Sequence, residues 1–308
     1  MVRSEGEDMS MRTMVSLWLL VLATPALAGG TEGGYAGAKT CIGCHEEVGT
    51  AFAASLHAKA WAGGVEGCES CHGPGVAHAD NPSRQSIGTF GSKATRGAAE
   101  QSTACLRCHE SFTELALWSQ GIHGRRDVTC ANCHRIHGGF SPSAAAPEVC
   151  YGCHLDVKID ANKQSRHPIK EGKVSCQSCH NPHGTLSKHL VKADTVNQLC
   201  YGCHADKRGP FLWEHPPVEE SCTTCHAAHG SRHKKMLVQK VPNLCQSCHD
   251  WSRHPGTPYD QRASFRGSAP SNRFFGRSCV NCHANIHGSM APNDPGGSGH
   301  NNGKAFLR

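Results

Sequence analysis

The cysteines of this chain recur in a single arrangement: two cysteines separated by two residues, with a histidine directly after the second. The sequence has 308 residues and 20 cysteines, and every cysteine belongs to one of ten such C-x-x-C-H motifs. In this motif two thiols form thioether bonds with the vinyl groups of a c-type haem, and the histidine binds the haem iron. One match would be weak evidence, whereas ten matches with no cysteine left over predict ten covalently bound haems.

The motifs assign a role to all of the cysteines and to ten histidines. The predicted attachment residues are Cys41, Cys44, Cys68, Cys71, Cys105, Cys108, Cys130, Cys133, Cys150, Cys153, Cys176, Cys179, Cys200, Cys203, Cys222, Cys225, Cys245, Cys248, Cys279 and Cys282. The predicted proximal iron ligands are His45, His72, His109, His134, His154, His180, His204, His226, His249 and His283. Zinc ribbons do not require a histidine after each second cysteine, and disulfide frameworks have irregular spacings, so both fit poorly.

The histidines outside the motifs follow a second pattern, which divides the chain into five units of two motifs each. The units span residues 41–78, 105–137, 150–183, 200–229 and 245–287. One histidine lies between the two motifs of each unit; these spacer histidines are His57, His123, His167, His215 and His254. Another follows the second motif; these trailing histidines are His78, His137, His183, His229 and His287. The two sets supply ten predicted distal iron ligands, and His189, His233 and His300 are expected to be surface residues.

A trailing histidine is not expected to bind the iron of its own motif. His137 follows His134 by three residues, and three residues reach at most about 11 Å. That span is too short to pass comfortably around a porphyrin edge. We therefore expect the motif histidine and the trailing histidine of one turn to bind two neighbouring irons. The spacing leaves open which distal histidine serves which haem.

Methionine, the usual alternative axial ligand, is scarce, since only Met236 and Met290 remain after residue 28. Ligation by two histidines therefore dominates, and this ligation implies low reduction potentials. An iron with both axial positions filled is also closed to substrates. The chain is thus predicted to carry electrons without turning over a substrate of its own.

The elements that hold these motifs cannot form an ordinary hydrophobic core. Leu, Ile, Val and Phe make up only about 15 % of residues 29–308, too few to offset the conformational entropy of folding. We expect the haems to form the core, wrapped by mostly irregular coil and short α-helices, with little or no β-sheet. The 34 glycines and 16 prolines suit such a wrapping. The expected shape is elongated, with the first and last motifs near opposite poles.

Several segments lie outside the repeated units. Residues 1–28 are predicted to be a Sec-type signal peptide, because a basic residue, an apolar run and a small-residue cleavage site follow one another. Residues 29–308 would then form the mature decahaem domain. Residues 79–104 are expected to be a loop, residues 255–278 to lengthen the last unit, and residues 288–308 to form a mobile tail. The net charge of +6 is expected to be offset by haem propionates, which argues against a nucleic-acid partner.

With these motifs in hand, the sequence resembles the DmsE/MtrA (PioA-like) family of decahaem c-type cytochromes over essentially the whole mature chain. The resemblance includes CESCHGPGVAH (68–78), RHPGTPYD (253–260) and NCHANIHGS (281–289). It implies a periplasmic protein associated with the outer membrane and inserted into an outer-membrane β-barrel of the MtrB/PioB type. The implied role is to carry electrons between periplasmic donor cytochromes and an outer-surface multihaem cytochrome or reductase, in extracellular respiration or iron oxidation.

Two other functions stay open from the sequence alone. One is a subunit of an extracellular cytochrome filament, and the other is a multihaem oxidoreductase of the nitrite or hydroxylamine type. Ten candidate distal ligands for ten motifs argue against both, because filaments often share ligands between subunits and such enzymes need an iron with an open position. The sequence does not give the direction of electron flow, the terminal donor or acceptor, or the individual potentials.

Overall fold

The computed structural model describes residues 34–60, 67–137, 146–249, 279–281 and 283–290. The predicted signal peptide, Cys282, His254, His300, residues 255–278 and the tail from residue 291 lie outside the described residues. In the described ranges the only β pairing consists of isolated bridges, such as His180 with Val191 and His226 with Leu237. No helix among these residues is long and apolar enough to cross a membrane.

Short helices joined by turns make up the described chain, in agreement with the predicted fold. The α-helices are α1 (Ala38–Cys44), α2 (Glu46–Ala53), α3 (Leu56–Ala60), α4 (Glu69–His72), α5 (Val76–Asp80), α6 (Ala98–His109), α7 (Cys130–Cys133), α8 (Pro147–Tyr151), α9 (Leu155–Asp160), α10 (Cys176–Cys179), α11 (Val196–Tyr201), α12 (Pro216–Glu220) and α13 (Asn243–Gln246). The 3₁₀ turns are η1 (Arg84–Ser86), η2 (Thr113–Leu115), η3 (Gly124–Arg126), η5 (Lys188–Leu190), η6 (Ala205–Lys207), η7 (Cys222–Thr224), η8 (Lys234–Met236) and η10 (Cys279–Asn281).

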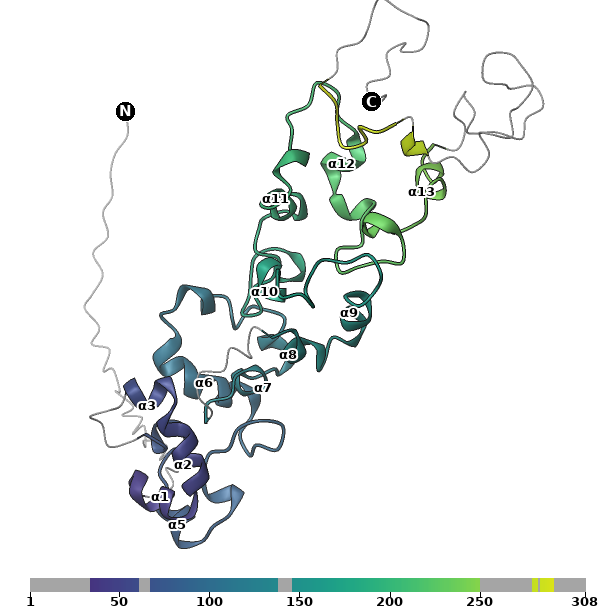
Figure 1. Cartoon of the computed structure of the whole chain (residues 1–308). Coiled ribbons are helices and arrows are strands. Elements are labelled where there is room, and N and C mark those ends of the chain that lie inside the picture. Colours follow the sequence, from purple (N-terminus) through teal and green to yellow (C-terminus); the bar gives the residue numbers. More distant parts are fainter. Residues whose placement is uncertain (1–33, 61–66, 138–145, 250–278, 282, 291–308) are drawn as a thin grey trace, which may run out of the picture.

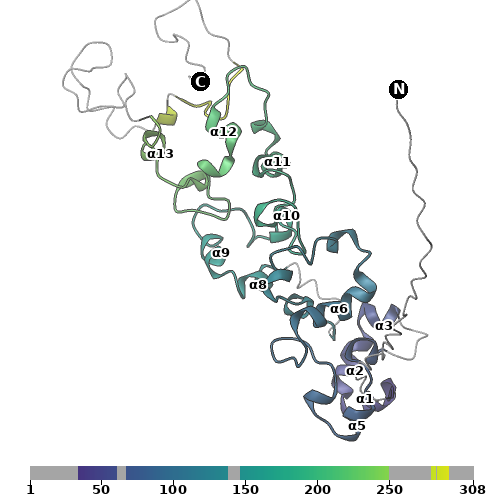
Figure 2. The ribbon, with the colours of Figure 1, turned by 180° about the vertical axis from the view of Figure 1, so that it is seen from behind.

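The described chain is elongated, and after α5, which returns to lie beside α1, its elements run along the long axis from α6 to α13 broadly in sequence order (Figure 1). Helices α1, α2 and α5 lie at one end, and α12, α13 and η10 lie at the other. The view from behind shows the same order (Figure 2). The first motif, in α1, and Cys279 of the last motif therefore lie near opposite ends, as expected.

Side chains alone do not form a core in this molecule. Among the described residues the buried hydrophobic side chains are Ala161 and Val191. Large apolar side chains such as Leu155 and Ile159 remain 60 % and 65 % exposed. Two small buried side chains stabilise a fold by only a few kcal/mol, far less than the cost of ordering the backbone. This burial pattern agrees with a fold that is organised around another apolar group.

The α1 end of the molecule is fastened by a buried carboxylate. Glu69 is 3 % exposed and accepts hydrogen bonds from the backbone N–H groups of Ala36 (2.8 Å), Gly37 (2.9 Å) and Gly75 (2.7 Å). Hydrogen bonds to an ionised acceptor are the stronger kind. Glu69 therefore ties the start of α1 to the second C-x-x-C-H motif, which lies about thirty residues further along the chain.

Candidate haem-binding sites

Each motif forms one tight helical turn that places its two cysteines and its histidine together. In the fourth motif, the His134 N–H donates to the Cys130 carbonyl over 2.8 Å, and in the sixth the His180 N–H donates to the Cys176 carbonyl over 2.9 Å. A threonine or serine precedes several second motifs of a unit and caps the turn. Thr129 forms a capping box with Asn132, and Ser175 forms one with Ser178. This cap is a local sequence signal that the motif pattern alone did not use.

The central feature of the structure is a set of nine histidine pairs whose rings face each other. The ring centres are 5.9 to 6.4 Å apart. The pairs are His45–His78, His57–His109, His72–His137, His123–His154, His134–His183, His167–His204, His180–His229, His215–His249 and His226–His287. A metal bound about 2 Å from each imidazole nitrogen would separate the ring centres by about 6 Å. The pairs therefore fit a haem iron held between two imidazoles.

Every pair joins one motif histidine to one predicted distal histidine, and the pairs interlock the five units. A trailing histidine faces the second motif of the preceding unit, as His183 faces His134. A spacer histidine faces the first motif of the following unit, as His123 faces His154. The exception is His78, which faces His45 within the first unit. Among the predicted ligands, His283 and His254 remain for the tenth motif, and His254 lies outside the described residues.

Backbone carbonyls fix the orientation of several of these imidazoles. The Nδ1 atoms of His180 and His226 each donate to a carbonyl 2.8 Å away, those of His189 and Lys235. His72, His78, His123 and His167 make equivalent bonds to backbone carbonyls. A carbonyl only accepts, so Nδ1 carries the proton and Nε2 keeps its lone pair for a metal. The donor set therefore has the tautomer that iron requires.

The same contacts tie one unit to the next. His123 donates to the carbonyl of Pro182, the residue before His183, over 2.9 Å. His167 likewise donates to the carbonyl of Ala228, the residue before His229, over 2.9 Å. A spacer histidine of one unit is thus held by the turn that carries the trailing histidine of the next.

The glycine that follows a trailing histidine allows this close approach. Gly184 and Gly230 have φ angles of 134° and 143°, which side chains rarely permit. A Cβ on Gly184 would overlap the Leu117 carbonyl, and one on Gly230 would overlap the Asp160 carbonyl. The repeated His-Gly step of the sequence therefore has a structural reason that sequence reasoning did not supply.

Burial keeps several of the predicted distal ligands neutral. It lowers the pKa of His183, His229 and His287 below the ordinary value of a histidine, and repulsion from the facing motif histidine acts in the same direction. A neutral imidazole is the form that binds a metal. Burial also lowers the pKa of His57 and His215.

Cysteines join consecutive motifs at nine junctions, where thiols from two motifs lie close enough to affect each other's charge. Within a unit the first cysteines meet, and these contacts are Cys41–Cys68, Cys105–Cys130, Cys150–Cys176, Cys200–Cys222 and Cys245–Cys279. Between units the second cysteines lie near enough for one thiol to raise the pKa of the other, and these neighbours are Cys71–Cys108, Cys133–Cys153, Cys179–Cys203 and Cys225–Cys248. Each of the second to ninth motifs thus approaches its two sequence neighbours through different cysteines.

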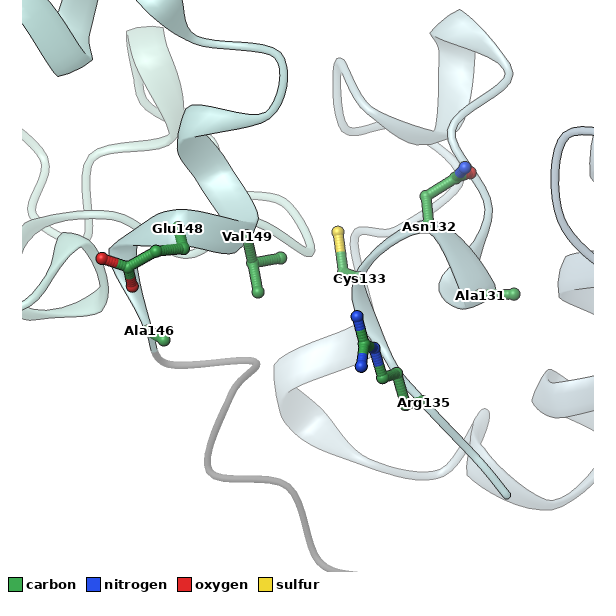
Figure 3. Close-up of a pocket in the computed structure, with 7 residues that line it drawn as sticks. All are labelled: Ala131, Asn132, Cys133, Arg135, Ala146, Glu148 and Val149. Carbon is green, nitrogen blue, oxygen red and sulfur yellow. The ribbon is translucent and has the colours of Figure 1, made fainter. Parts of the chain in front are cut away.

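A cavity of about 530 Å³ opens at one of these junctions, between α7 and α8. Figure 3 shows Cys133 pointing into the space between the two ribbons, with Val149 and Glu148 on the opposite side and Arg135 beside the cysteine. Space next to an attachment cysteine fits a bound macrocycle, and a cation in the wall suits haem carboxylates. The cavity therefore belongs to the same chain of sites.

His189 and His233, two of the three histidines predicted to be surface residues, do not belong to the nine facing pairs. The side chain of His189 is exposed and that of His233 is half-buried, while His300 lies outside the described residues. The backbone of His189 nevertheless matters, because its carbonyl orients His180. No pattern in the sequence indicates that the His189 carbonyl orients His180.

Comparison with known proteins agrees with this geometry. Residues 167–209 and 215–254 each match the family described as a doubled CXXCH motif, and residues 68–147 match the NrfB-like c-type cytochromes. The multiheme cytochrome MtrA of Shewanella baltica is 39 % identical over 274 residues, which cover 85 % of this chain and 81 % of that protein. The C-type polyheme cytochrome OmcB of Geobacter sulfurreducens is 26 % identical over 219 residues, 55 % of this chain and 28 % of OmcB.

Proposed function

Since the chain belongs to the MtrA family of multihaem c-type cytochromes, which transfer electrons through covalently bound haems, we propose that it is a single-file electron conductor with ten haems. Each haem supplies an iron that alternates between the ferric and ferrous states. The protein supplies attachment through the twenty motif cysteines and axial ligation through the ten motif histidines and the ten spacer and trailing histidines. As an electron carrier, the chain has no substrate turnover of its own.

The observation that carries this proposal is the combination of facing histidine pairs and cysteine junctions. The pairs support a bis-histidine iron at each of the first nine motifs, because their ring centres lie at the separation that a bound iron would require. The junctions bring each of these sites next to the following one, along the long axis of Figure 1. Electrons can then pass from motif to motif in sequence order, between one end of the molecule and the other.

The pairs also favour a carrier over the two alternative functions. Each of the nine paired motif histidines finds its partner within the same chain, so these sites need no ligand from a neighbouring filament subunit. The facing histidines would fill both axial positions of a haem iron at these nine motifs, and a multihaem oxidoreductase needs one that is open.

We further propose that the conductor works in the periplasm at the outer membrane, inside a β-barrel of the MtrB/PioB type. Conduction across a lipid bilayer requires insulation of the polar wrapping from hydrocarbon, because unsatisfied backbone groups are costly there. A barrel wall supplies that insulation. Periplasmic cytochromes would exchange electrons at one end, and an outer-surface cytochrome or reductase would do so at the other.

Two experiments test this function. Intact mass of the exported protein should exceed the apoprotein mass by ten haems, with cleavage after Ala28, whereas eight or fewer would contradict the repeat. The complex with its co-purifying barrel, reconstituted in liposomes, should allow an external reductant to reduce an internal acceptor. Equal conduction by the barrel alone would refute the proposal.

A further inference from the structure

The segment between the first two units is built around the second motif. Residues 84–101, here called the strap, had been expected to be part of a loop. Within it, the Gly88 N–H donates to the His72 carbonyl over 2.9 Å, and His72 Nδ1 donates to the Gly88 carbonyl over 2.6 Å. The ring of Phe90 meets the His72 ring edge-on, with centres 5.3 Å apart. The strap thus holds this imidazole on two sides.

Arg96 places a cation directly on the same motif. Its guanidinium donates to the carbonyls of Cys71 (3.0 Å) and His72 (3.2 Å), and its side chain is 21 % exposed. Its ion-pair partner Glu100, 3.3 Å away, is 65 % exposed, so solvent screens that negative charge much more than the positive one. The Arg96 charge near the motif is therefore only partly neutralised.

The strap is shaped to keep Arg96 in this position. Gly88 lies so close that a Cβ there would overlap the guanidinium carbon. Gln101, which is 5 % exposed, donates to the Arg96 carbonyl and accepts from the Gly91 N–H, both over 2.9 Å. These contacts fix the backbone on either side of the arginine.

In the third and fourth units, a backbone N–H binds the carbonyl of the second motif that Arg96 binds in the first unit. The Cys179 carbonyl accepts from the backbone N–H of Lys192 over 3.0 Å, and the Cys225 carbonyl accepts from that of Val238 over 2.9 Å. The histidines of these three motifs are otherwise bound alike, because Nδ1 of His72, His180 and His226 each donates to one backbone carbonyl. At the second motif, by contrast, the group that binds these carbonyls carries a permanent positive charge.

From this difference we infer that Arg96 is a positioning residue that raises the reduction potential of the haem held by His72. A nearby cation disfavours the ferric state relative to the ferrous state, and net charge around a haem is one of the terms that set its potential. The haem at His72 then holds an electron more firmly than it would without Arg96. It provides an electron-holding step close to the α1 end, where electrons enter or leave. This inference rests on the haem attachment proposed above.

The test compares Arg96→Gln, Arg96→Lys and Lys93→Gln in the full-length haem-loaded protein. Reduction is followed by a redox titration with optical and paramagnetic resonance detection. In Arg96→Gln one haem should shift, with its ratio of reduced to oxidised forms lowered about tenfold at fixed potential, which corresponds to about 59 mV for one electron. Arg96→Lys should retain most of the wild-type ratio. Lys93→Gln makes the same charge change at an exposed site of the strap and should leave the ratio unchanged.

A second variant tests the position of the Arg96 charge while the arginine itself is kept. Gly88→Ala should displace the guanidinium without removing its charge from the chain and should lower the same ratio. The inference is overturned if ten haems are present by mass and no haem shifts in Arg96→Gln, or if the lysine variant shifts as far as the glutamine variant. Wild-type protein with no haem at the second motif would instead contradict the proposed function.

Discussion

Replacement of one trailing histidine tests the interlocked ligation most directly. His183 follows the sixth motif in sequence but faces His134 of the fourth motif, with ring centres 6.0 Å apart. His180, its sequence neighbour, faces His229 at 6.1 Å. His183→Ala should therefore open the iron of the fourth motif and leave the iron of the sixth with both ligands.

The size of the effect follows from the count of sites. One open ferrous iron among ten binds about one carbon monoxide per chain, so about a tenth of the haem absorption should change on adding the gas. A cryo-electron microscopy map of the variant under carbon monoxide should place the gas on the iron bound by His134. His189→Ala, at an exposed histidine of the same region, is the matched control and should bind none. Gas on the iron of His180, or no binding at all, would refute the interlocked arrangement.

Three other predictions follow from the local geometry. Because burial lowers the pKa of His229, the low-spin spectrum should persist as the pH falls through about 6.5, where an exposed histidine protonates; high-spin haem appearing near that pH would contradict this. Gly230→Ala should destabilise the holoprotein by more than about 1 kcal/mol in denaturant titrations, since the new Cβ meets the Asp160 carbonyl at a φ of 143°. Glu69→Gln should lower the free energy of unfolding by about 1–3 kcal/mol and speed amide exchange of residues 36 and 37, because the new amide group presents a donor to backbone N–H groups. Glu100→Gln, at an exposed carboxylate, should change neither quantity.

The sequence predicted the haem-binding motifs of this protein better than the pairing of its histidines. The sequence predicts the haem-binding role of Cys41 and His45 directly, because they belong to one short motif whose turn is closed by a single backbone hydrogen bond. The poor apolar composition correctly predicted short helices without a side-chain core. The pairing of His123 with His154 depends instead on a turn at Pro182, which is 59 residues away from His123. No local pattern encodes such a contact.

The strap shows a different limit of sequence reasoning. Residues 79–104 are polar and rich in glycine and serine, a composition typical of loops. Their order comes from specific contacts, in which Arg96 binds two motif carbonyls and the buried Gln101 closes the strap. In a loop-like segment, the sequence does not show whether a charged side chain donates to backbone carbonyls, as Arg96 does, or lies in solvent.

The facing pairs also change how the five predicted units should be understood. The boundary between the second and third units is crossed by two pairs, His134–His183 and His123–His154. Separation of the chain there would remove one axial ligand from each side, so neither part would retain a complete set. Among the nine facing pairs, the first motif finds its partner within its own unit, through His78, whereas the other eight pairs join neighbouring units. The second motif of each of the first four units therefore finds its facing histidine only in the following unit. Haem binding and chain folding are thus coupled along the whole molecule, and the units are repeats of sequence rather than independent domains.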